Sequence, residues 1–273
     1  MNFMNVETIK LCGENERASL TTFLPCTRKE KSDAILIIPG GGYTGVCADR
    51  EGENIAIAFN ALGYACFVLD YSVKPNAVFP RPLIEASLAM VHIRENAEKY
   101  KVDPERVFVL GFSAGGHLAG SLGTRWHIPE VANAINAPFG TNKPKGMILC
   151  YPVLCWFDND KTHKGTFHNA FGTETPTEEQ IEMISLENGL TKENTPPAFL
   201  WHTATDQAVN VQNSLKMATA LSEAGIPFEV HIFPDGPHGM ALGTPVTGAT
   251  PAMINDRVAE WPRLAAGWMQ SLN

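Results

Sequence analysis

One short stretch, residues 106–123, predicts a strand, a sharp turn and a helix in direct succession. Residues 107–110 are apolar and rich in β-branched and aromatic side chains, which favours a buried strand. Gly-Phe-Ser-Ala-Gly follows at 111–115 and leads into small residues with helical character. In a turn this tight neighbouring side chains would collide, and the two glycines remove them. The stretch therefore predicts a nucleophile elbow, which holds the Ser113 hydroxyl clear of the backbone beside the free N–H groups of a helix start.

Strand-like and helix-like segments alternate from residue 34 onward. Near-continuous apolar runs predict parallel strands that are buried on both faces, with helices between them. The predicted strands are Ala34–Pro39, Ala65–Asp70, Arg106–Gly111, Gly146–Tyr151, Ala198–His202 and Phe228–Phe233, and the predicted helices are Glu51–Leu62, Leu83–Tyr100, Ala114–Gly123, Val211–Ala224 and Asp256–Ser271. Before them, Met4–Lys10 and Ser19–Leu24 favour two antiparallel strands. We expect an α/β fold: a mostly parallel central sheet with helices on both faces and an N-terminal antiparallel edge.

The chain shows no internal repeat, low-complexity tract or charged linker along its 273 residues. This predicts a single domain over 1–273. The longest interruption of the strand–helix alternation is 156–197, which is polar and contains a helix candidate at Glu178–Glu187. Long insertions are either plain excursions or functional caps. We therefore expect a cap or pocket wall here, with the excursion as the alternative.

Charge and cysteine usage narrow the class of protein. The net charge is −8, from 21 basic and 29 acidic residues, and there is no basic run, which argues against a nucleic-acid partner. There is no apolar run of membrane-spanning length, and the six cysteines form no CxxC pair. No secretion signal is visible at the N-terminus, so a cytoplasmic protein is predicted, unless an export signal had been removed. Cys/His clusters and HExxH are also absent from the sequence, so we expect no metal and no cofactor.

A serine nucleophile needs a general base, and eight histidines compete for that role. His238 alone lies in a turn-rich loop directly after the last predicted strand. This places it at the carboxyl edge of the sheet, where Ser113 also emerges. His238 is therefore the predicted base.

The base in turn needs a carboxylate to orient it. Asp206 lies four residues beyond the strand that ends at His202, at the same edge of the sheet and one strand before His238. Its alternative interpretation is a turn or helix-cap aspartate. Asp158 and Asp160, after the preceding strand, compete for the role, and Asp235 is too close in sequence to the base. Asp206 is the predicted acid.

A second glycine cluster supports two interpretations. Residues 40–45 follow a strand and satisfy G-x-G-x-x-G, and Asp70 ends the next strand, as a dinucleotide-binding protein would require. However, residues 46–53 separate the motif from the expected helix, and a nucleotide site leaves the serine, aspartate and histidine unexplained. The cluster fits better as a loop that supplies oxyanion-binding N–H groups.

Five blocks of the sequence together resemble a known family. They are Pro39-Gly40-Gly41-Gly42-Tyr43, Arg50-Glu51-Gly52-Glu53, Asp70-Tyr71-Ser72-Val73, residues 111–118 and Phe199-Leu200-Trp201-His202-Thr203. The chain resembles the small bacterial α/β-hydrolase esterases related to acetyl-xylan esterases, which are similar to hormone-sensitive-lipase-like and prolyl-oligopeptidase-like enzymes. Pro39 stands where the usual glycine loop opens with a histidine. The resemblance implies an α/β-hydrolase fold, a triad of Ser113, Asp206 and His238, and an oxyanion hole made of the N–H groups of Gly41, Gly42 and Ala114.

The expected function is hydrolysis of short-chain, chiefly acetyl, esters through an acyl-enzyme. Relatives act on acetylated carbohydrates such as xylo-oligosaccharides, so the expected partner is a small ester. Tyr43, Trp156 and His163 are the candidates for lining the substrate pocket. One alternative is a serine peptidase of prolyl-oligopeptidase type, which the lack of a propeller-sized partner domain disfavours. The other is a nucleotide-binding or non-catalytic protein.

Overall fold

The computed structural model describes residues 6–13, 16–26, 30–75, 78–157 and 159–272. In this part of the chain one sheet has the strand order β1-β2-β4-β3-β5-β6-β7-β8. The strands are β1 Thr8–Lys10, β2 Ser19–Phe23, β3 Ser32–Ile38, β4 Ala65–Asp70, β5 Val102–Phe112, β6 Met147–Cys150, β7 Ala198–Thr203 and β8 Phe228–Phe233. Strand β2 runs antiparallel to β1 and β4, and β3 to β8 pair in parallel with their neighbours. The predicted mostly parallel sheet with an antiparallel N-terminal edge is confirmed.

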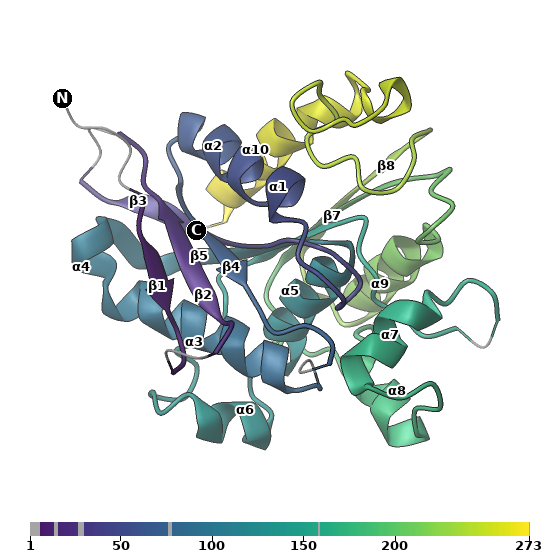
Figure 1. Cartoon of the computed structure of the whole chain (residues 1–273), viewed down its shortest axis with the longest axis horizontal. Helices are drawn as coiled ribbons and strands as arrows, with labels where there is room; N and C mark the ends of the chain where they lie inside the picture. Colours follow the sequence, from purple (N-terminus) through teal and green to yellow (C-terminus); the bar gives the residue numbers. More distant parts are fainter. Residues whose placement is uncertain (1–5, 14–15, 27–29, 76–77, 158, 273) are drawn as a thin grey trace.

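Helices cover both faces of the sheet (Figure 1). Helices α2 (Glu53–Ala61) and α10 (Trp261–Ser271) pack on one face, and α3 (Arg81–Glu95), α5 (Ser113–Arg125) and α9 (Gln212–Glu223) pack on the other. Side chains of β3 point alternately to the two faces of the sheet. Ala34, Leu36 and Ile38 join the core under α3 and α5, and Ile35 and Ile37 join the core under α2 and α10. The strands are apolar throughout because both faces are buried.

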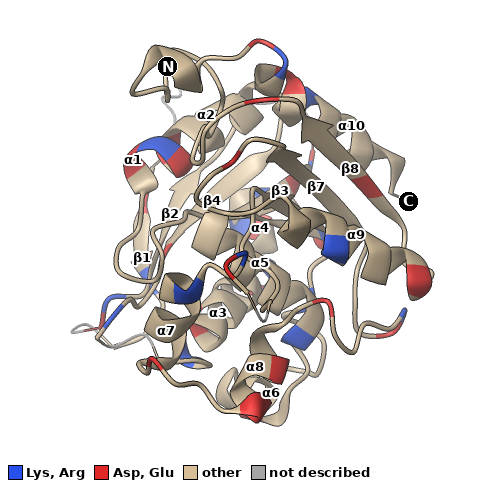
Figure 2. Ribbon diagram, turned by 90° about the vertical axis from the view of Figure 1, so that its right-hand side faces the viewer, with Lys and Arg blue, Asp and Glu red and all other residues tan. Residues whose placement is uncertain are grey.

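Charged side chains lie mainly on the peripheral helices and loops rather than on the sheet (Figure 2). The shorter elements are α1 (Ala48–Glu51), α4 (Ala97–Tyr100), α6 (Pro129–Ala134), α7 (Lys164–Phe171), α8 (Glu178–Ile184) and the 3₁₀ turns η1 (Pro251–Met253) and η2 (Val258–Glu260). Within the described ranges, no helix is long and apolar enough to cross a membrane.

Three predicted helices differ from the observed ones. The helix expected at Glu51–Leu62 starts earlier and is broken at Gly52, whose dihedrals (φ −110°, ψ −93°) are not helical. The helix expected at Leu83–Tyr100 is interrupted at Asn96. The last helix begins at Trp261 rather than Asp256, since Pro262 stands in its first turn. The first strand starts at Thr8, and Met4 and Asn5 lie outside the described residues.

The insertion at 156–197 carries two helices, of which only α8 was predicted. Helix α8 ends at Ile184, three residues short of the expected end. Helix α7 has an unusual N-cap, the ring of His163, which accepts a hydrogen bond from the N–H of Thr166. Because histidine is not a typical N-cap residue, the sequence gives little signal for this helix.

Candidate active site

The nucleophile elbow forms at the junction of β5 and α5. Ser113 is the first residue of α5 and has a φ of +53°, a conformation that costs energy for any residue with a Cβ. A Cβ at Gly111 would lie 2.2 Å from the carbonyl oxygen of Gly115, and one at Gly115 would lie 2.2 Å from the carbonyl oxygen of Ile38. The close approach of backbone to backbone therefore requires both glycines, and it holds the serine on a sharp turn.

The structure brings the three predicted triad residues together at the carboxyl edge of the sheet, Ser113 from the start of α5 and Asp206 and His238 from the loops after β7 and β8. His238 Nε2 lies 2.8 Å from Ser113 Oγ, and His238 Nδ1 lies 2.6 Å from Asp206 Oδ2. The Asp206 carboxylate accepts a hydrogen bond from the Nδ1–H of His238, so Nε2 faces the serine as the acceptor. This is the geometry in which a histidine can remove the hydroxyl proton.

Hydrogen bonds hold Asp206 in its charged form. Its Oδ1 accepts the backbone N–H groups of Ala208 and Val209, each at 2.9 Å. His202 Nε2 lies 3.3 Å from Oδ2. Burial alone would raise the pKa of Asp206, but hydrogen bonding from His202 and His238 and the charge of His238 outweigh it and hold the pKa well below the usual range. Asp206 thus stays ionised while it orients the base.

Two of the competing carboxylates and four of the other histidines have surroundings that set them apart from the triad. Asp160 and Asp235 are exposed, and Asp158 lies outside the described residues. Four histidines outside the triad have other hydrogen-bond partners: His92 with Tyr100, His117 with Tyr43, His202 with Ser214, and His231 with Glu229.

The glycine loop after β3 lies over the elbow. A Cβ at Gly40 would come within 3.0 Å of Ser113 Cβ, and Gly41 and Gly42 have φ values of +133° and +63°. In the described part of the chain, the N–H groups of Gly41, Gly42 and Ala114 donate to no protein group. Free donors beside a nucleophile are what a developing oxyanion requires.

Three side chains fix this loop where the usual opening histidine is replaced by proline. Tyr71 donates to the carbonyl of Pro39 (2.9 Å), Glu51 accepts from the N–H of Gly40 (2.8 Å), and Asn169 of α7 donates to the carbonyl of Gly42 (2.8 Å). The insertion therefore touches the oxyanion loop directly.

The dinucleotide interpretation of the same loop does not fit the structure. Helix α1 begins only at Ala48, so no helix opens directly from the glycines. The carboxylate of Asp70 is bound by Arg17, with 2.8 Å between Nε and Oδ1. The glycines serve the elbow instead.

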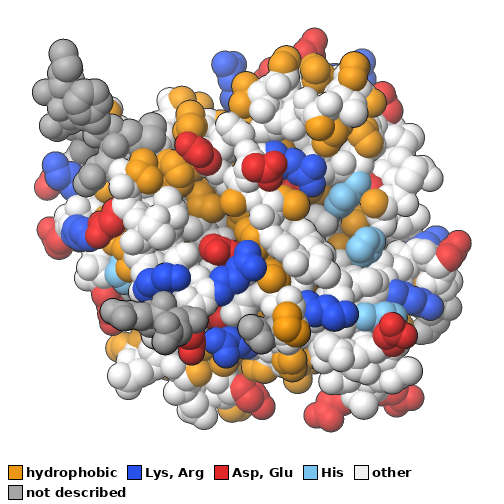
Figure 3. Space-filling model, in the orientation of Figure 1, with side chains coloured by type: hydrophobic (Ala, Val, Ile, Leu, Met, Phe, Trp, Pro, Cys, Tyr) orange, Lys and Arg blue, Asp and Glu red, His pale blue; other side chains and the backbone are white. Residues whose placement is uncertain are grey.

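A pocket of about 190 Å³ lies at the triad. It is lined by Gly41, Gly42, Cys47, Arg50, Glu51, Ser113, His163 and His238. Figure 3 shows histidine side chains beside a basic side chain on the face that carries α1 and α7. Because the Thr166 N–H donates to His163 Nδ1, the ring proton is on Nε2. Burial and the neighbouring His238 lower the pKa of His163, which favours this neutral form.

Of the three predicted substrate-wall residues, the structure places His163 at this pocket and the other two elsewhere. The prediction for Tyr43 is wrong: its side chain is fully buried and its hydroxyl lies 2.9 Å from His117 Nδ1. Trp156 packs against Phe167 of α7, with ring centroids 5.7 Å apart, and does not line the pocket in the described structure. Both aromatic rings serve packing.

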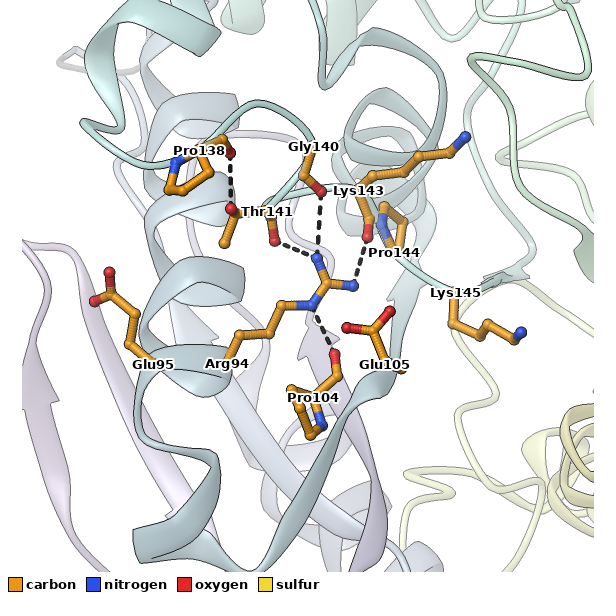
Figure 4. Close-up of a pocket in the computed structure, with 10 residues that line it drawn as sticks. All are labelled: Arg94, Glu95, Pro104, Glu105, Pro138, Gly140, Thr141, Lys143, Pro144 and Lys145. Atoms are coloured by element: carbon orange, nitrogen blue, oxygen red, sulfur yellow. Dashed lines mark hydrogen bonds between the residues drawn. The ribbon is translucent and has the colours of Figure 1, made fainter.

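A larger pocket, of about 620 Å³, lies at the opposite edge of the sheet, near the start of β5 and the loop before β6. Its central residue is Arg94, whose guanidinium donates to the carbonyls of Pro104, Gly140, Thr141 and Lys143 (Figure 4). Arg94 thus connects β5 to the loop before β6, and these bonds use four of its five N–H donors.

The fold and the geometry at Ser113 define an α/β hydrolase. The BD-FAE family model matches residues 20–221, and the chain belongs to this family. Endo-1,4-beta-xylanase B of Butyrivibrio fibrisolvens is 39% identical over 215 residues, covering 78% of this chain and 33% of the relative. The acetylxylan esterase of Xylanibacter ruminicola is 29% identical over 234 residues, covering 85% of this chain and 45% of the relative. The chain therefore spans between a third and a half of the length of these curated relatives.

A solved structure is similar over nearly its whole length. The acetyl ester-xyloside bifunctional hydrolase from Caldicellulosiruptor lactoaceticus superposes with a TM-score of 0.82 at 33% identity, covering 97% of this chain and 96% of that one. The resemblance to acetyl-xylan-esterase-related α/β hydrolases, predicted from the sequence blocks, is confirmed by these matches.

Sequence reasoning assigned no role to several residues at the site. Cys47, Arg50 and Glu51 line the pocket. Tyr151 donates a hydrogen bond to Glu51, and His202 contacts Asp206. The Arg50-Glu51-Gly52-Glu53 block, which is part of the family resemblance, was the available signal for two of them.

Proposed function

We propose that this protein is a serine carboxylesterase that cleaves short-chain, chiefly acetyl, esters of small carbohydrates through an acyl-enzyme. The proposal rests on the two hydrogen-bond distances that join Ser113, His238 and Asp206, at 2.8 and 2.6 Å, beside three free N–H groups. Each component of an acyl-transfer site is therefore within reach of one ester carbonyl.

His238 takes the Ser113 proton as Oγ attacks the ester carbonyl, and the oxyanion accepts hydrogen bonds from the N–H groups of Gly41, Gly42 and Ala114. Such a donor contributes roughly 3–4 kcal/mol to transition-state stability. His238, held by Asp206, gives its proton to the leaving alcohol. Water, deprotonated by the same histidine, then releases the acid and restores Ser113. This cycle uses no metal or redox cofactor.

The lining of the pocket supports a small acyl group. Apart from glycine, Cys47 and the reacting residues, the side chains around it are polar, and its volume is only about 190 Å³. Each further methylene would need about 0.8 kcal/mol of apolar burial to be bound well. Few apolar side chains are there to supply it, so acetyl and propionyl esters are favoured.

Hydrogen-bond donors support an oxygen-rich alcohol half. The Nη2 of Arg50 contacts Cys47 Sγ at 3.8 Å. The Arg50 side chain lines the pocket and is 36% exposed. His163 lines the same pocket, and the capping bond to Nδ1 leaves its Nε2–H as a donor. Two similar proteins are named as an acetylxylan esterase and as an acetyl ester-xyloside bifunctional hydrolase. An acetylated xylo-oligosaccharide fits these donors.

The test is kcat/KM for p-nitrophenyl esters from two to eight acyl carbons, measured beside release of acetate from acetylated xylo-oligosaccharides. Acetyl and propionyl esters should be cleaved far faster than octanoyl ones, and Ser113→Ala gives the background. A maximum at eight carbons would contradict the proposed acyl class. Absence of acetate release from the oligosaccharides, with normal p-nitrophenyl acetate turnover, would contradict the carbohydrate assignment alone.

A further inference from the structure

Glu51 is a carboxylate buried beneath the active site, with an exposure of 1%. It ends the short helix α1, directly after the glycine loop. Its Oε2 accepts the N–H of Gly40 at 2.8 Å, and its Oε1 accepts the hydroxyl of Tyr151 at 2.8 Å. Burying a carboxylate is costly unless its oxygens are satisfied, and here both are. The catalytic cycle described above makes no use of it.

Tyr151 carries this contact onward to the loop of the general base. It follows β6, has a φ of +36° and is 2% exposed. Its hydroxyl accepts the N–H of Ala241 at 3.0 Å, and its ring meets the His238 imidazole edge-on, with centroids 5.0 Å apart. The loop that carries His238 is thereby held at two points by one tyrosine.

Glu51 and Tyr151 thus connect the two halves of the site. On one side is the glycine loop that offers the oxyanion N–H groups, and on the other is the loop of His238. These segments are far apart in sequence. Oε2 of Glu51 contacts the glycine loop directly, and Oε1 reaches the His238 loop through the Tyr151 hydroxyl. A misplacement of about 1 Å between such groups can cost about 100-fold in rate.

We propose that Glu51 is a positioning residue that, through Gly40 and Tyr151, fixes the oxyanion loop against the general base His238. The inference rests on the proposed esterase function and deepens it. The negative charge of the Glu51 carboxylate also attracts His238 and favours the imidazolium that forms when Ser113 gives up its proton.

Hydrogen bonds and neighbouring charges favour the charged form of Glu51, and burial opposes it. Burial raises the pKa of Glu51 above its usual value, and the Gly40 N–H, Arg50, Tyr151 and His238 offset only part of that rise. Arg50 Nε lies 3.7 Å from Oε1. The titratable groups that face Glu51 are Cys47, Arg50, Tyr71, Cys150, Tyr151 and His238. The burial-raised pKa values of the Cys47 and Cys150 thiols and the Tyr71 and Tyr151 hydroxyls keep these four groups neutral.

The experiment compares Glu51→Gln, Tyr151→Phe and the double variant, with Glu53→Gln as the matched control because Glu53 is exposed two residues further on. The measurements are kcat and KM for p-nitrophenyl acetate, the pH profile of kcat/KM and the melting temperature. Glu51→Gln should lower kcat about 10- to 100-fold and leave KM within about threefold. The acidic limb of the profile should move down by about 0.5 pH unit, because the imidazolium loses a negative neighbour.

If the two residues act as one connection, the double variant should be no more than about threefold slower than the slower single variant. Tyr151→Phe keeps the inference testable if Glu51→Gln does not fold. A lower melting temperature with unchanged kcat and unchanged pH profile would show a merely structural role and overturn it, as would additive losses. Those outcomes would leave the proposed esterase intact as long as Ser113→Ala is inactive, whereas an active Ser113→Ala would overturn the proposed function itself.

Discussion

The two edges of the sheet each carry a pocket with an arginine, and the smaller pocket is the one equipped for chemistry. At the amino edge, Arg94 lines a pocket of about 620 Å³, but its guanidinium donates hydrogen bonds to four backbone carbonyls. At the carboxyl edge, Arg50 lies in about 190 Å³ beside Ser113, and its Nε, although buried, has no hydrogen-bond partner in the described structure. Free N–H donors beside a nucleophile, rather than the volume of a pocket, mark where the reaction is expected.

The largest effect that this contrast predicts is at Ser113. Ser113→Ala should lower kcat on p-nitrophenyl acetate by about 10⁴–10⁶ while the protein stays folded, because the acyl-enzyme cannot form. Stopped-assay kinetics with a circular dichroism control measure this. Near-normal turnover by the folded variant would contradict an active site at the carboxyl edge of the sheet.

The next effect concerns the acid. Asp206→Asn should lower kcat about 10⁴-fold, because an amide favours the wrong tautomer of His238. Asp160→Asn, in an exposed position of the insertion, is the matched control and should turn over normally. The assignment fails if the control loses activity and Asp206→Asn keeps it.

At the amino edge the expected effect is on stability alone. Arg94→Met should lower the free energy of unfolding by about 3 kcal/mol, because four carbonyls lose a charged donor. The value of kcat should not change. Chemical denaturation beside the same assay tests both statements, with the exposed Arg263→Met of α10 as control. A loss of kcat without loss of stability would mean that the larger pocket takes part in the reaction.

The smallest predicted effect is a pH dependence of the free energy of unfolding, which comes from the buried His117. Burial lowers the pKa of His117 to about 4, and it lies against Tyr43 and the carbonyl of Ile184. The unfolded chain binds this proton near pH 6.5 and the folded chain does not, so stability falls as pH drops from about 6.5 toward 4. At pH 5 this amounts to about 2 kcal/mol. Chemical denaturation at several pH values from 8 to 5 measures this. The free energy of unfolding should fall less with decreasing pH in His117→Gln than in the unmodified protein, and an equal fall would contradict a neutral buried His117.

Sequence patterns predicted regular elements well and side-chain contacts poorly. The strands Ala65–Asp70 and Phe228–Phe233 match their predicted bounds, since an apolar run limited by turns determines a buried strand locally. Helix ends were less predictable: Gly52 and Asn96 break helices through local backbone geometry that periodicity does not show.

Within the site, the chain order of serine, aspartate and histidine and the strand ends placed Ser113, Asp206 and His238 at one edge, where they meet. Tyr43 was misjudged because position after a glycine loop says nothing about which way a side chain points, and here it points into the core. Glu51 was missed because its partners, Gly40 and Tyr151, come together only in three dimensions.

The most direct measurement is covalent trapping at the carboxyl edge. The protein is treated with diethyl p-nitrophenyl phosphate, and the intact mass, the labelled peptide and the residual esterase activity are followed together. One phosphoryl adduct on the peptide that contains Ser113, formed in step with the loss of activity and absent from Ser113→Ala, is the predicted result. Inactivation with the adduct on another residue, or continued turnover by fully labelled protein, would contradict Ser113 as the nucleophile.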